Sequence, residues 1–376
     1  MALDDLYGKI LAVGADVIRE QTYLPALVNH VTNEDKTLAR SKGGIVEVIV
    51  PPDFVTRDVV PASTPPASQG EPAPSTVQVA LDNFKEVNIP LTEKQITQLE
   101  AADPMAIMFI QNAVGPIIED ITAAIAATYK GIYGYVGTAG TTPFASNPAD
   151  AQNTKKVLTR QKCPKMMRSM VLNTDAYANA IGLEAFRSYL QFGSDSTVRY
   201  GEVDMAYGFR FHEDVGMDGI SHTTGGGAGW LVNQADHAVA DTTVVIDTGS
   251  GDPVVGDIFT VAGDTQTYVV SGYASNTITY APAAKVAWAN NAAITFKASH
   301  AINLAFNPFA FAFDSRPHAR LRLPGVTSNY MTWVDDMTGV TLRLEIRDEY
   351  HQTGIYLSCL FGAELVDPRL ACRIAG

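Results

Sequence analysis

The chain has 376 residues, of which 46% are hydrophobic and 18% charged, and 40 acidic against 27 basic side chains give a net charge of −13. This length predicts two or three compact domains and excludes global disorder, while the acidic balance argues against a nucleic-acid reader, which needs clustered Lys and Arg. We expect no membrane span, no export signal and no disulfide framework, because apolar runs are short, acids follow Met1, and the three cysteines are scattered.

The N-terminal region predicts an arm followed by a strand. Residues 4–31 place apolar side chains at helical spacing, which predicts one amphipathic helix with little core of its own. Residues 45–50 are β-branched and alternate in polarity, so they predict a strand, and Pro51 and Pro52 end it.

A proline-rich stretch follows that strand. Seven prolines lie between residues 51 and 74, and they exclude an inner strand because each proline lacks a backbone donor. Alternation resumes at Val77, Val79 and Leu81 and continues to Ile89. We favour a long hairpin with a proline-rich tip, and a domain linker is the alternative.

A long helix is predicted next. Asp103 and Pro104 are typical of a helix start, and isoleucines then recur at steps of three and four up to Ile125. A helix from 104 to about 130 would be roughly 40 Å long. Gly115 and Pro116 lie in its middle, where we expect a kink.

Residues 154–213 predict a mixed α/β unit. Thr154 is expected to cap one helix and Thr174 with Asp175 another, and residues 170–172 and 209–211 predict short strands.

Composition changes after the glycines at 225–229. Residues 230–299 contain two Lys, no Arg, and five short β-type runs. Those runs are 243–247, 258–262, 267–270, 277–280 and 293–297. The spacing predicts a small all-β module, a barrel or a sandwich, inserted into the α/β unit. Residues 338–350 and 354–366 predict two further strands.

One segment of the chain partly matches a catalytic motif. Asp247-Thr248-Gly249-Ser250 after apolar residues resembles the active-site turn of an aspartic protease, but that chemistry needs a second such Asp, which the chain lacks. A turn between two strands is the simpler interpretation. His212, Glu213 and Asp214 have no second His at ligand spacing, and Cys163 has no assignable base, although nearby cations would lower a thiol pKa.

Six cations between residues 155 and 168 form a basic stretch in this acidic chain. The stretch could meet nucleic acid or an acidic partner segment, or it could be a solvated helix face that pairs with acids of neighbouring subunits. We favour the second interpretation.

The C-terminal third resembles a known family. The segments that carry the resemblance are 303–313 with Arg316 and Pro317, 339–344, Tyr350, 360–368, and 371–374. They are similar to segments of the major capsid proteins of tailed bacteriophages, which have the HK97-like fold. The order of arm, hairpin, long helix and α/β unit is also similar, and the insert, with its run 256–261, resembles the extra β-domain of podovirus coat proteins.

The resemblance implies an α+β, HK97-like capsid fold with an inserted all-β domain. The implied segments are an N-terminal arm (1–40), an E-loop hairpin (41–92), a P-domain with the spine helix (93–153), a first A-domain part (154–228), the insert (229–300), a second A-domain part (301–335) and C-terminal P-domain strands (336–376). We see no support for the covalent cross-link of some relatives.

The implied function is structural, with no enzyme activity and no cofactor. The chain would assemble with itself as hexamers and pentamers into an icosahedral head around double-stranded DNA, bound without sequence specificity, and an aspartic-type hydrolase using Asp247 is the alternative. A scaffolding protein and a portal protein at one vertex would be partners, with a decoration protein as an optional one, and the protein would be a virion component assembled in the host cytoplasm. Expected inter-subunit contacts are Arg57, Asp58, Pro65, Pro66 and Glu71, and expected hinges are Gly115, Pro116, Gly225, Gly226 and Gly227.

Overall fold

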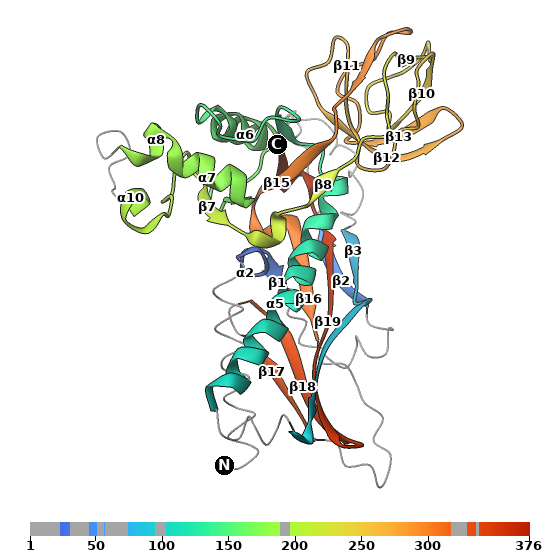
Figure 1. Ribbon diagram of the computed structural model, residues 1–376. Helices are drawn as coiled ribbons and strands as arrows, with labels where there is room; N and C mark the ends of the chain where they lie inside the picture. The colour runs from blue at the N-terminus through green and yellow to red at the C-terminus, as the bar shows by residue number, and fades with distance from the viewer. Residues whose placement is uncertain are drawn as a thin grey trace, which may run out of the picture.

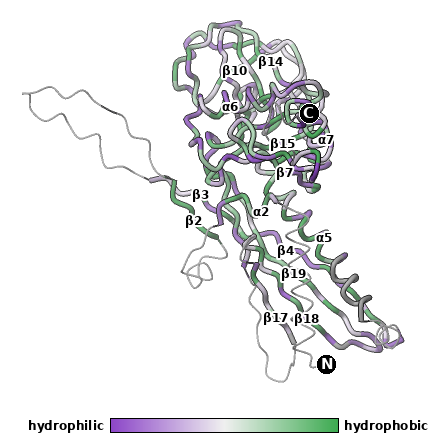
Figure 2. Tube along the Cα trace, turned by 90° about the vertical axis from the view of Figure 1, so that its left-hand side faces the viewer, coloured by the Kyte–Doolittle hydropathy of each residue, from purple (hydrophilic) through white to green (hydrophobic). Residues whose placement is uncertain are grey.

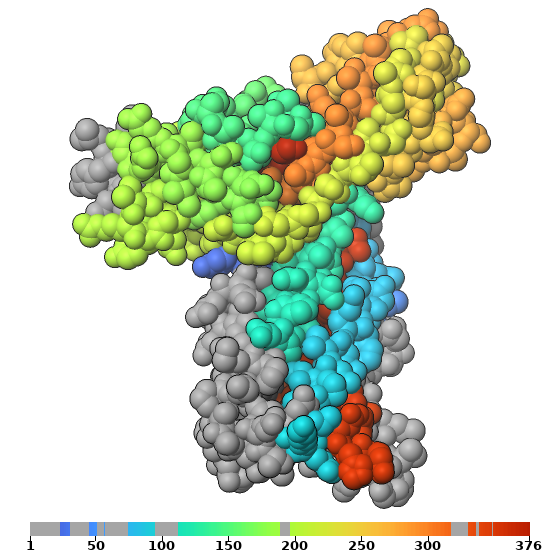
Figure 3. All heavy atoms as spheres, viewed as in Figure 1, coloured from blue at the N-terminus to red at the C-terminus, as the bar shows by residue number. Residues whose placement is uncertain are grey.

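The computed structural model describes residues 23–30, 45–50, 56, 74–94, 103–188, 196–316, 329–335 and 338–376. These parts form an elongated lower half and a broader upper half that divides into two lobes (Figures 1 and 3). The same division is visible from the side in Figure 2, where α5, β4, β17, β18 and β19 lie below and α6, β7, β10, β14 and β15 lie above.

The lower half is built on one long, mostly antiparallel sheet, called here the long sheet. Its strands in order are β1 (Asn29–His30), β16 (Phe311–Ser315), β19 (Gln352–Leu365), β18 (Thr341–Glu349) and β17 (Asn329–Val334), with β4 (Asn83–Thr92) also paired to β19. The two C-terminal strands expected from sequence are thus confirmed as β18 and β19, which pair from Arg343 with Ser358 to Glu349 with Gln352.

Helix α5 (Asp103–Ala127) packs along the long sheet and ends in the short helix η1 (Thr128–Gly131). Ile117, Ile121 and Ile125 lie in one buried cluster with Leu344 and Phe361 of the sheet, as the helical periodicity predicted. The helix continues through Pro116 without interruption. The long helix expected from sequence is confirmed.

The predicted hairpin is confirmed, but its second strand is shorter than expected. β2 (Ile45–Val50) pairs antiparallel with β3 (Ser75–Ala80), and this pair packs against Ala312 of β16. The alternation from Val77 to Ile89 is interrupted, because the chain leaves β3 after Ala80 and re-enters as β4 in the long sheet. A Cβ on Gly362 of β19 would lie 2.1 Å from the carbonyl oxygen of Ala80, so the two backbones cross in close contact at this break.

The left-hand upper lobe in Figure 1 is a second sheet with helices beside it. The order of its strands is β5 (Tyr135–Gly137), β20 (Ala371–Ala375), β15 (His300–Phe306), β6 (Ser169–Leu172) and β7 (Arg210–Glu213), and β8 (Ser221–His222) also pairs with β15. Its helices are α6 (Ala149–Arg160), α7 (Thr174–Gly182), α8 (Glu184–Arg187) and α10 (Ser196–Tyr200).

The strands predicted at 170–172 and 209–211 correspond to β6 and β7, but both helix caps were placed wrongly. Thr154 lies inside α6, where its hydroxyl donates to the carbonyl of Asp150, a bond that a mid-helix Thr makes to the preceding turn. The cap of α7 is Asn173, one residue before Thr174, because its side-chain oxygen accepts from the N–H of Ala176.

Strand pairing also divides the C-terminal region differently from the predicted boundary at 335/336. β16 and β17, expected in the second A-domain part, belong to the long sheet, whereas β20, expected among the P-domain strands, lies in the second sheet between β5 and β15. Two short helices, η3 (Pro308–Ala310) and η4 (Pro368–Leu370), connect the two sheets, and η2 (Val215–Met217) lies between β7 and β8 of the second sheet. Helix α2 (Leu24–Leu27) packs on α5.

The right-hand upper lobe is an antiparallel barrel made from residues 231–296 alone. The strand order is β14 (Ile294–Phe296), β11 (Ile258–Val261), β12 (Tyr268–Ala274), β13 (Thr277–Ala281), β10 (Thr243–Asp247) and β9 (Leu231–Val232). A bridge between Leu231 and Ala293 joins the two outer strands, so the sheet closes. All five predicted β-runs contain a strand, and the core is aromatic, with Phe259, Tyr268, Tyr280 and Trp288 in mutual contact.

Within the described ranges, no helix combines the length and the apolar character that crossing a bilayer requires.

Candidate functional site

A buried polar cluster lies where the barrel, the second sheet and the end of α5 meet. We call it the junction, and it consists of Tyr129, His222, Asp257, His300 and Arg373. Each of these side chains is at least 94% buried, and Asp257 and Arg373 are fully buried. A buried polar group is costly unless it is paired. Most polar atoms of the cluster are paired, and the exceptions are Nε of Arg373 and Nε2 of His300, which have no hydrogen-bond partner among the described residues.

Arg373 of β20 occupies the centre of the junction. Its guanidinium donates to the carbonyl of Gly256 at 2.8 Å and to that of Lys130 at 3.4 Å, and it lies 5.0 Å from the centre of the Tyr129 ring. Burial lowers the pKa of Arg373 to about 10, opposed by Tyr129 and Asp257, so the side chain stays cationic at neutral pH.

Asp257 forms the barrel's side of the junction. Its Oδ1 lies 2.7 Å from Nε2 of His222, and its Oδ2 accepts from the N–H groups of Gly225, Gly226 and Val254. Burial alone would raise the pKa of Asp257, but the hydrogen bonds from His222, the backbone and Thr224 outweigh it and lower the pKa. The carboxylate therefore holds the entry to the barrel in place.

The glycines at the start of the insert are closely packed. A Cβ on Gly225 would lie 2.3 Å from the carbonyl oxygen of Asp252, and one on Gly227 would lie 2.1 Å from that of Ser250. Sequence analysis interpreted Gly225, Gly226 and Gly227 as a hinge. Their rotation stays a prediction. The structure adds a second reason for Gly here, since two backbone segments touch.

A second anchor lies at the lower edge of the second sheet. The buried carboxylate of Asp214 accepts hydrogen bonds from the N–H groups of Tyr23, Leu24 and Gly216. Burial raises the pKa of Asp214, opposed by these bonds. The N-terminal segment is thereby fixed to the loop after β7.

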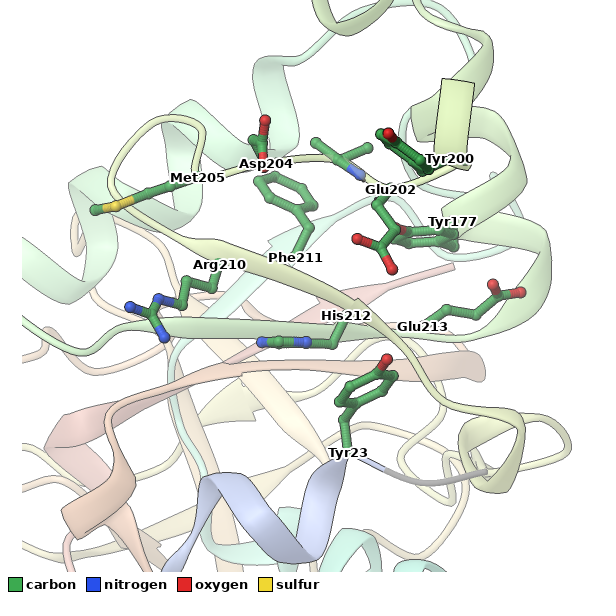
Figure 4. A pocket seen from close by; sticks show the side chains of 12 residues that line it. Tyr23, Tyr177, Tyr200, Glu202, Asp204, Met205, Arg210, Phe211, His212 and Glu213 are labelled. Atoms are coloured by element: carbon green, nitrogen blue, oxygen red, sulfur yellow. Dashed lines mark hydrogen bonds between the residues drawn. The ribbon is translucent and has the colours of Figure 1, made fainter. Parts of the chain in front are cut away.

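A hollow of ≈ 540 Å³ lies beside this anchor, between Tyr23, α10 and β7 (Figure 4). Tyr23 lies under His212 with 5.0 Å between ring centres, and burial with the nearby Arg210 lowers the pKa of His212. The lining of the hollow includes three carboxylates. However, no three His, Cys, Asp or Glu side chains of the described residues are placed to hold a metal ion.

The two residues considered for catalysis lie in structural settings. Asp247 ends β10, before the Thr248–Ser250 turn that leads towards β11, and its Oδ1 has no hydrogen-bond partner among the residues the structure describes. Cys163 is buried, which raises its thiol pKa against the lowering effect of Arg168. The nearby cations therefore do not activate this thiol, contrary to the tendency expected from sequence.

The other predicted site residues fall in two groups. Arg57, Asp58, Pro65, Pro66 and Glu71 lie outside the described residues. Gly115 and Pro116 lie within α5, and their role as hinges stays a prediction.

Sequence analysis missed the junction residues. The one available signal was Arg373 itself, a single charge in the apolar run from Ala371 to Ala375, since a cation at such a place must be paired inside the protein. His222 and Asp257 carry no local signal, because their pairing joins residues 35 apart in the chain.

No protein-family model matches the chain, and no curated protein matches its sequence. Solved structures do match. The capsid structure of the cyanophage P-SCSP1u matches with a TM-score of 0.50 and 11% identity over 94% of this chain and 88% of that one. A chain of Mycobacterium phage Che8 matches with a TM-score of 0.49 and 14% identity over 94% and 91%. The first match confirms the predicted HK97-like capsid fold for nearly the whole chain.

Proposed function

We propose that this chain is the major capsid protein of a tailed bacteriophage. It assembles as hexamers and pentamers into the icosahedral head that encloses the double-stranded DNA genome. The observation that carries the proposal is the fold shared with a cyanophage capsid structure over 94% of this chain. The role is structural and non-enzymatic, and no cofactor is needed.

The shape of the single chain supports this role. The long sheet and α5 form an extended plate, and the β2–β3 hairpin lies at its side (Figure 2). Edge strands of this length are normally protected, and neighbouring subunits would cover them.

Exposed apolar side chains on the plate and on the β2–β3 hairpin also support assembly. Ile49 of β2 is 68% exposed, Phe84 of β4 is 56% exposed and Tyr350 at the β18–β19 turn is 90% exposed. Burying such a side chain between subunits contributes roughly 1.5–3 kcal/mol, so several per chain would drive closure of a shell.

The remaining partner assignments follow from the same proposal. A scaffolding protein would guide assembly, a portal protein would occupy one vertex, and a decoration protein would be an optional partner. The protein would assemble in the host cytoplasm and end in the virion. A net charge of −13 per chain would keep the shell wall from adhering to packaged DNA.

The segments predicted from sequence keep their proposed roles, and the observed strand pairing decides to which sheet β16, β17 and β20 belong. The insert would be an outer module attached through the junction. Arg57, Asp58, Pro65, Pro66 and Glu71 would contact neighbouring subunits, and Gly115, Pro116 and Gly225–Gly227 would absorb the differences between hexamers and pentamers.

The proposal is tested by purifying the chain and adding a polyanionic or polycationic scaffold analogue over a range of concentration and salt. The expected result is closed particles of uniform diameter by electron microscopy. A chain that stays a monodisperse monomer or dimer under all these conditions would overturn the proposal.

A further inference from the structure

A basic hollow lies between α6 and the barrel. It has a volume of ≈ 350 Å³, and its charged lining consists of Lys156 and Arg160 of α6 with Lys285 and Lys297 of the barrel. The described residues that line it include no Asp or Glu. In a chain with 13 more acidic than basic side chains, such a concentration of positive charge is distinctive.

The two segments that form the hollow are far apart in sequence. Residues 230–299 contain two Lys and no Arg, and both lysines face this hollow. Lys285 Nζ donates to Gln266 Oε1 at 2.8 Å, and Lys297 Nζ lies 5.8 Å from the centre of the Tyr135 ring. The barrel therefore directs all its cationic side chains towards the cations of α6.

These charges are not neutralised within the described part of the chain. None of the four cations forms an ion pair there. The adjacent carboxylate, Asp264, accepts from the N–H of Gln266, the hydroxyl of Tyr268 and the indole of Trp288, so it is engaged towards the barrel interior. Like charges that line one hollow repel one another, and a bound anion would relieve this repulsion.

The chemistry of the hollow favours carboxylates over nucleic acid. Single-stranded or duplex nucleic acid is bound by cations that follow the backbone along a groove. Here the cations surround one confined hollow, with amide and hydroxyl groups of Gln161 and Thr265 beside them. A second copy of this chain, with its 40 acidic side chains, presents carboxylates of the required charge.

We propose that this hollow binds an acidic segment of a neighbouring copy of the chain in the assembled shell. The inference rests on the proposed function and names one of its subunit contacts. It also divides the basic stretch 155–168: Lys156 and Arg160 act in the contact, while Lys155 and Lys165 lie outside the hollow.

The first test compares two charge reversals in the full chain. The variant K156E/R160E removes two cations of the hollow, and the matched control K155E/K165E changes the net charge equally at exposed positions of the same stretch. We expect the threshold concentration for assembly to rise about tenfold in the first variant and to stay unchanged in the control. Equal thresholds in both variants and the wild type, or equal increases in both variants, would overturn the inference.

The second test needs no variant and therefore does not depend on folding. A mixture of ¹⁴N- and ¹⁵N-labelled wild-type chains is assembled and treated with a carbodiimide, which joins a Lys amine to a contacting carboxylate with loss of water. Mass spectrometry should find mixed-isotope cross-links from Lys156, Lys285 or Lys297 to Asp or Glu. Cross-links from these lysines that are all within one chain would overturn the inference.

The same samples separate this inference from the proposed function and from the nucleic-acid alternative. Wild-type chains that form no shells would overturn the proposed function, and the inference with it. Shells that form equally well from K156E/R160E would overturn only the inference. If that variant assembles normally but loses binding to a duplex or single-stranded DNA probe, the hollow binds nucleic acid instead.

Discussion

The guanidinium carbon of Arg373 lies 5.0 Å from the centre of the Tyr129 ring, so strand β20 contacts η1, the short helix that follows α5. The same guanidinium donates to the carbonyl of Gly256 in the barrel. One buried cation thus connects three segments that are distant in sequence. This contact is one of several that attach the barrel to the rest of the chain, and the hydrogen bond from the Thr267 hydroxyl to the carbonyl of Tyr133 is another.

Replacing Arg373 by Met should lower the free energy of unfolding by about 3 kcal/mol, because charged hydrogen bonds to two buried carbonyls are lost while the apolar volume is mostly kept. A urea titration followed by tryptophan fluorescence measures the change. The control Arg347→Met removes a half-exposed ion-pair partner of Glu345. It should lower the free energy of unfolding by about 1 kcal/mol or less. Equal losses in the two variants would contradict a special role for Arg373.

The variant Asp257→Asn should release the entry to the barrel. The carboxylate accepts hydrogen bonds from His222, Gly225 and Gly226 through two oxygens, whereas an amide has only one acceptor oxygen. We therefore expect the free energy of unfolding to fall by about 2–3 kcal/mol. Hydrogen exchange should show faster exchange of the Gly225 and Gly226 amides.

The matched control for that change is Asp252→Asn, at an exposed position in the neighbouring loop. It should change the free energy of unfolding by no more than about 0.5 kcal/mol. Unchanged exchange at both glycines in Asp257→Asn would show that the carboxylate does not hold this segment.

Adding one methyl group at Gly227 should disturb the same segment. The new Cβ would lie 2.1 Å from the carbonyl oxygen of Ser250, and relieving this overlap should cost about 1–3 kcal/mol. Gly182→Ala is the control, since its Cβ would meet no atom within 4 Å. Scanning calorimetry should show a lower melting temperature for Gly227→Ala alone, and two unchanged temperatures would contradict the packed arrangement.

Stability should fall as the pH drops below the ordinary pKa of histidine, partly because of His300. Burial lowers the pKa of His300, with the positive charge of Arg373 and the neighbouring His222 acting in the same direction. Below pH about 6.5 the unfolded chain then binds a proton that the folded chain binds less readily, so stability decreases until the pH reaches the lowered pKa.

Urea unfolding midpoints measured between pH 7.5 and 5 check this expectation. Steps of about half a pH unit resolve the contribution of one titrating group to the stability. His300→Gln should show a shallower decline than the wild-type chain. Parallel curves for the two proteins would mean that His300 does not contribute to the pH dependence.

The elements predicted correctly are those whose signal is local. The isoleucines of α5 recur on one helical face, and the barrel strands are short β-branched runs bounded by turn residues, so each could be identified without knowing its partner. The hairpin of β2 and β3 was also found, since its two strands have similar length and alternation.

The elements predicted wrongly depend on contacts between distant segments. Val77 and Ile89 share one alternation, yet they lie in different sheets because the backbone of Ala80 crosses Gly362 of β19. Likewise β20 follows the strands of the long sheet in sequence but pairs with β15, and no local pattern distinguishes these partners. The junction shares this property, since its side chains come from segments that are distant in sequence, namely η1, β8, the loop before β11, β15 and β20.

The most direct test of the capsid role is a cryo-electron microscopy reconstruction of particles assembled from the purified chain. The account predicts closed icosahedral shells, with rings of five subunits at the vertices and rings of six between them, into which this fold fits as the repeating unit. Purified chains that form only small soluble species, or particles whose density does not accommodate the long sheet and α5, would contradict it.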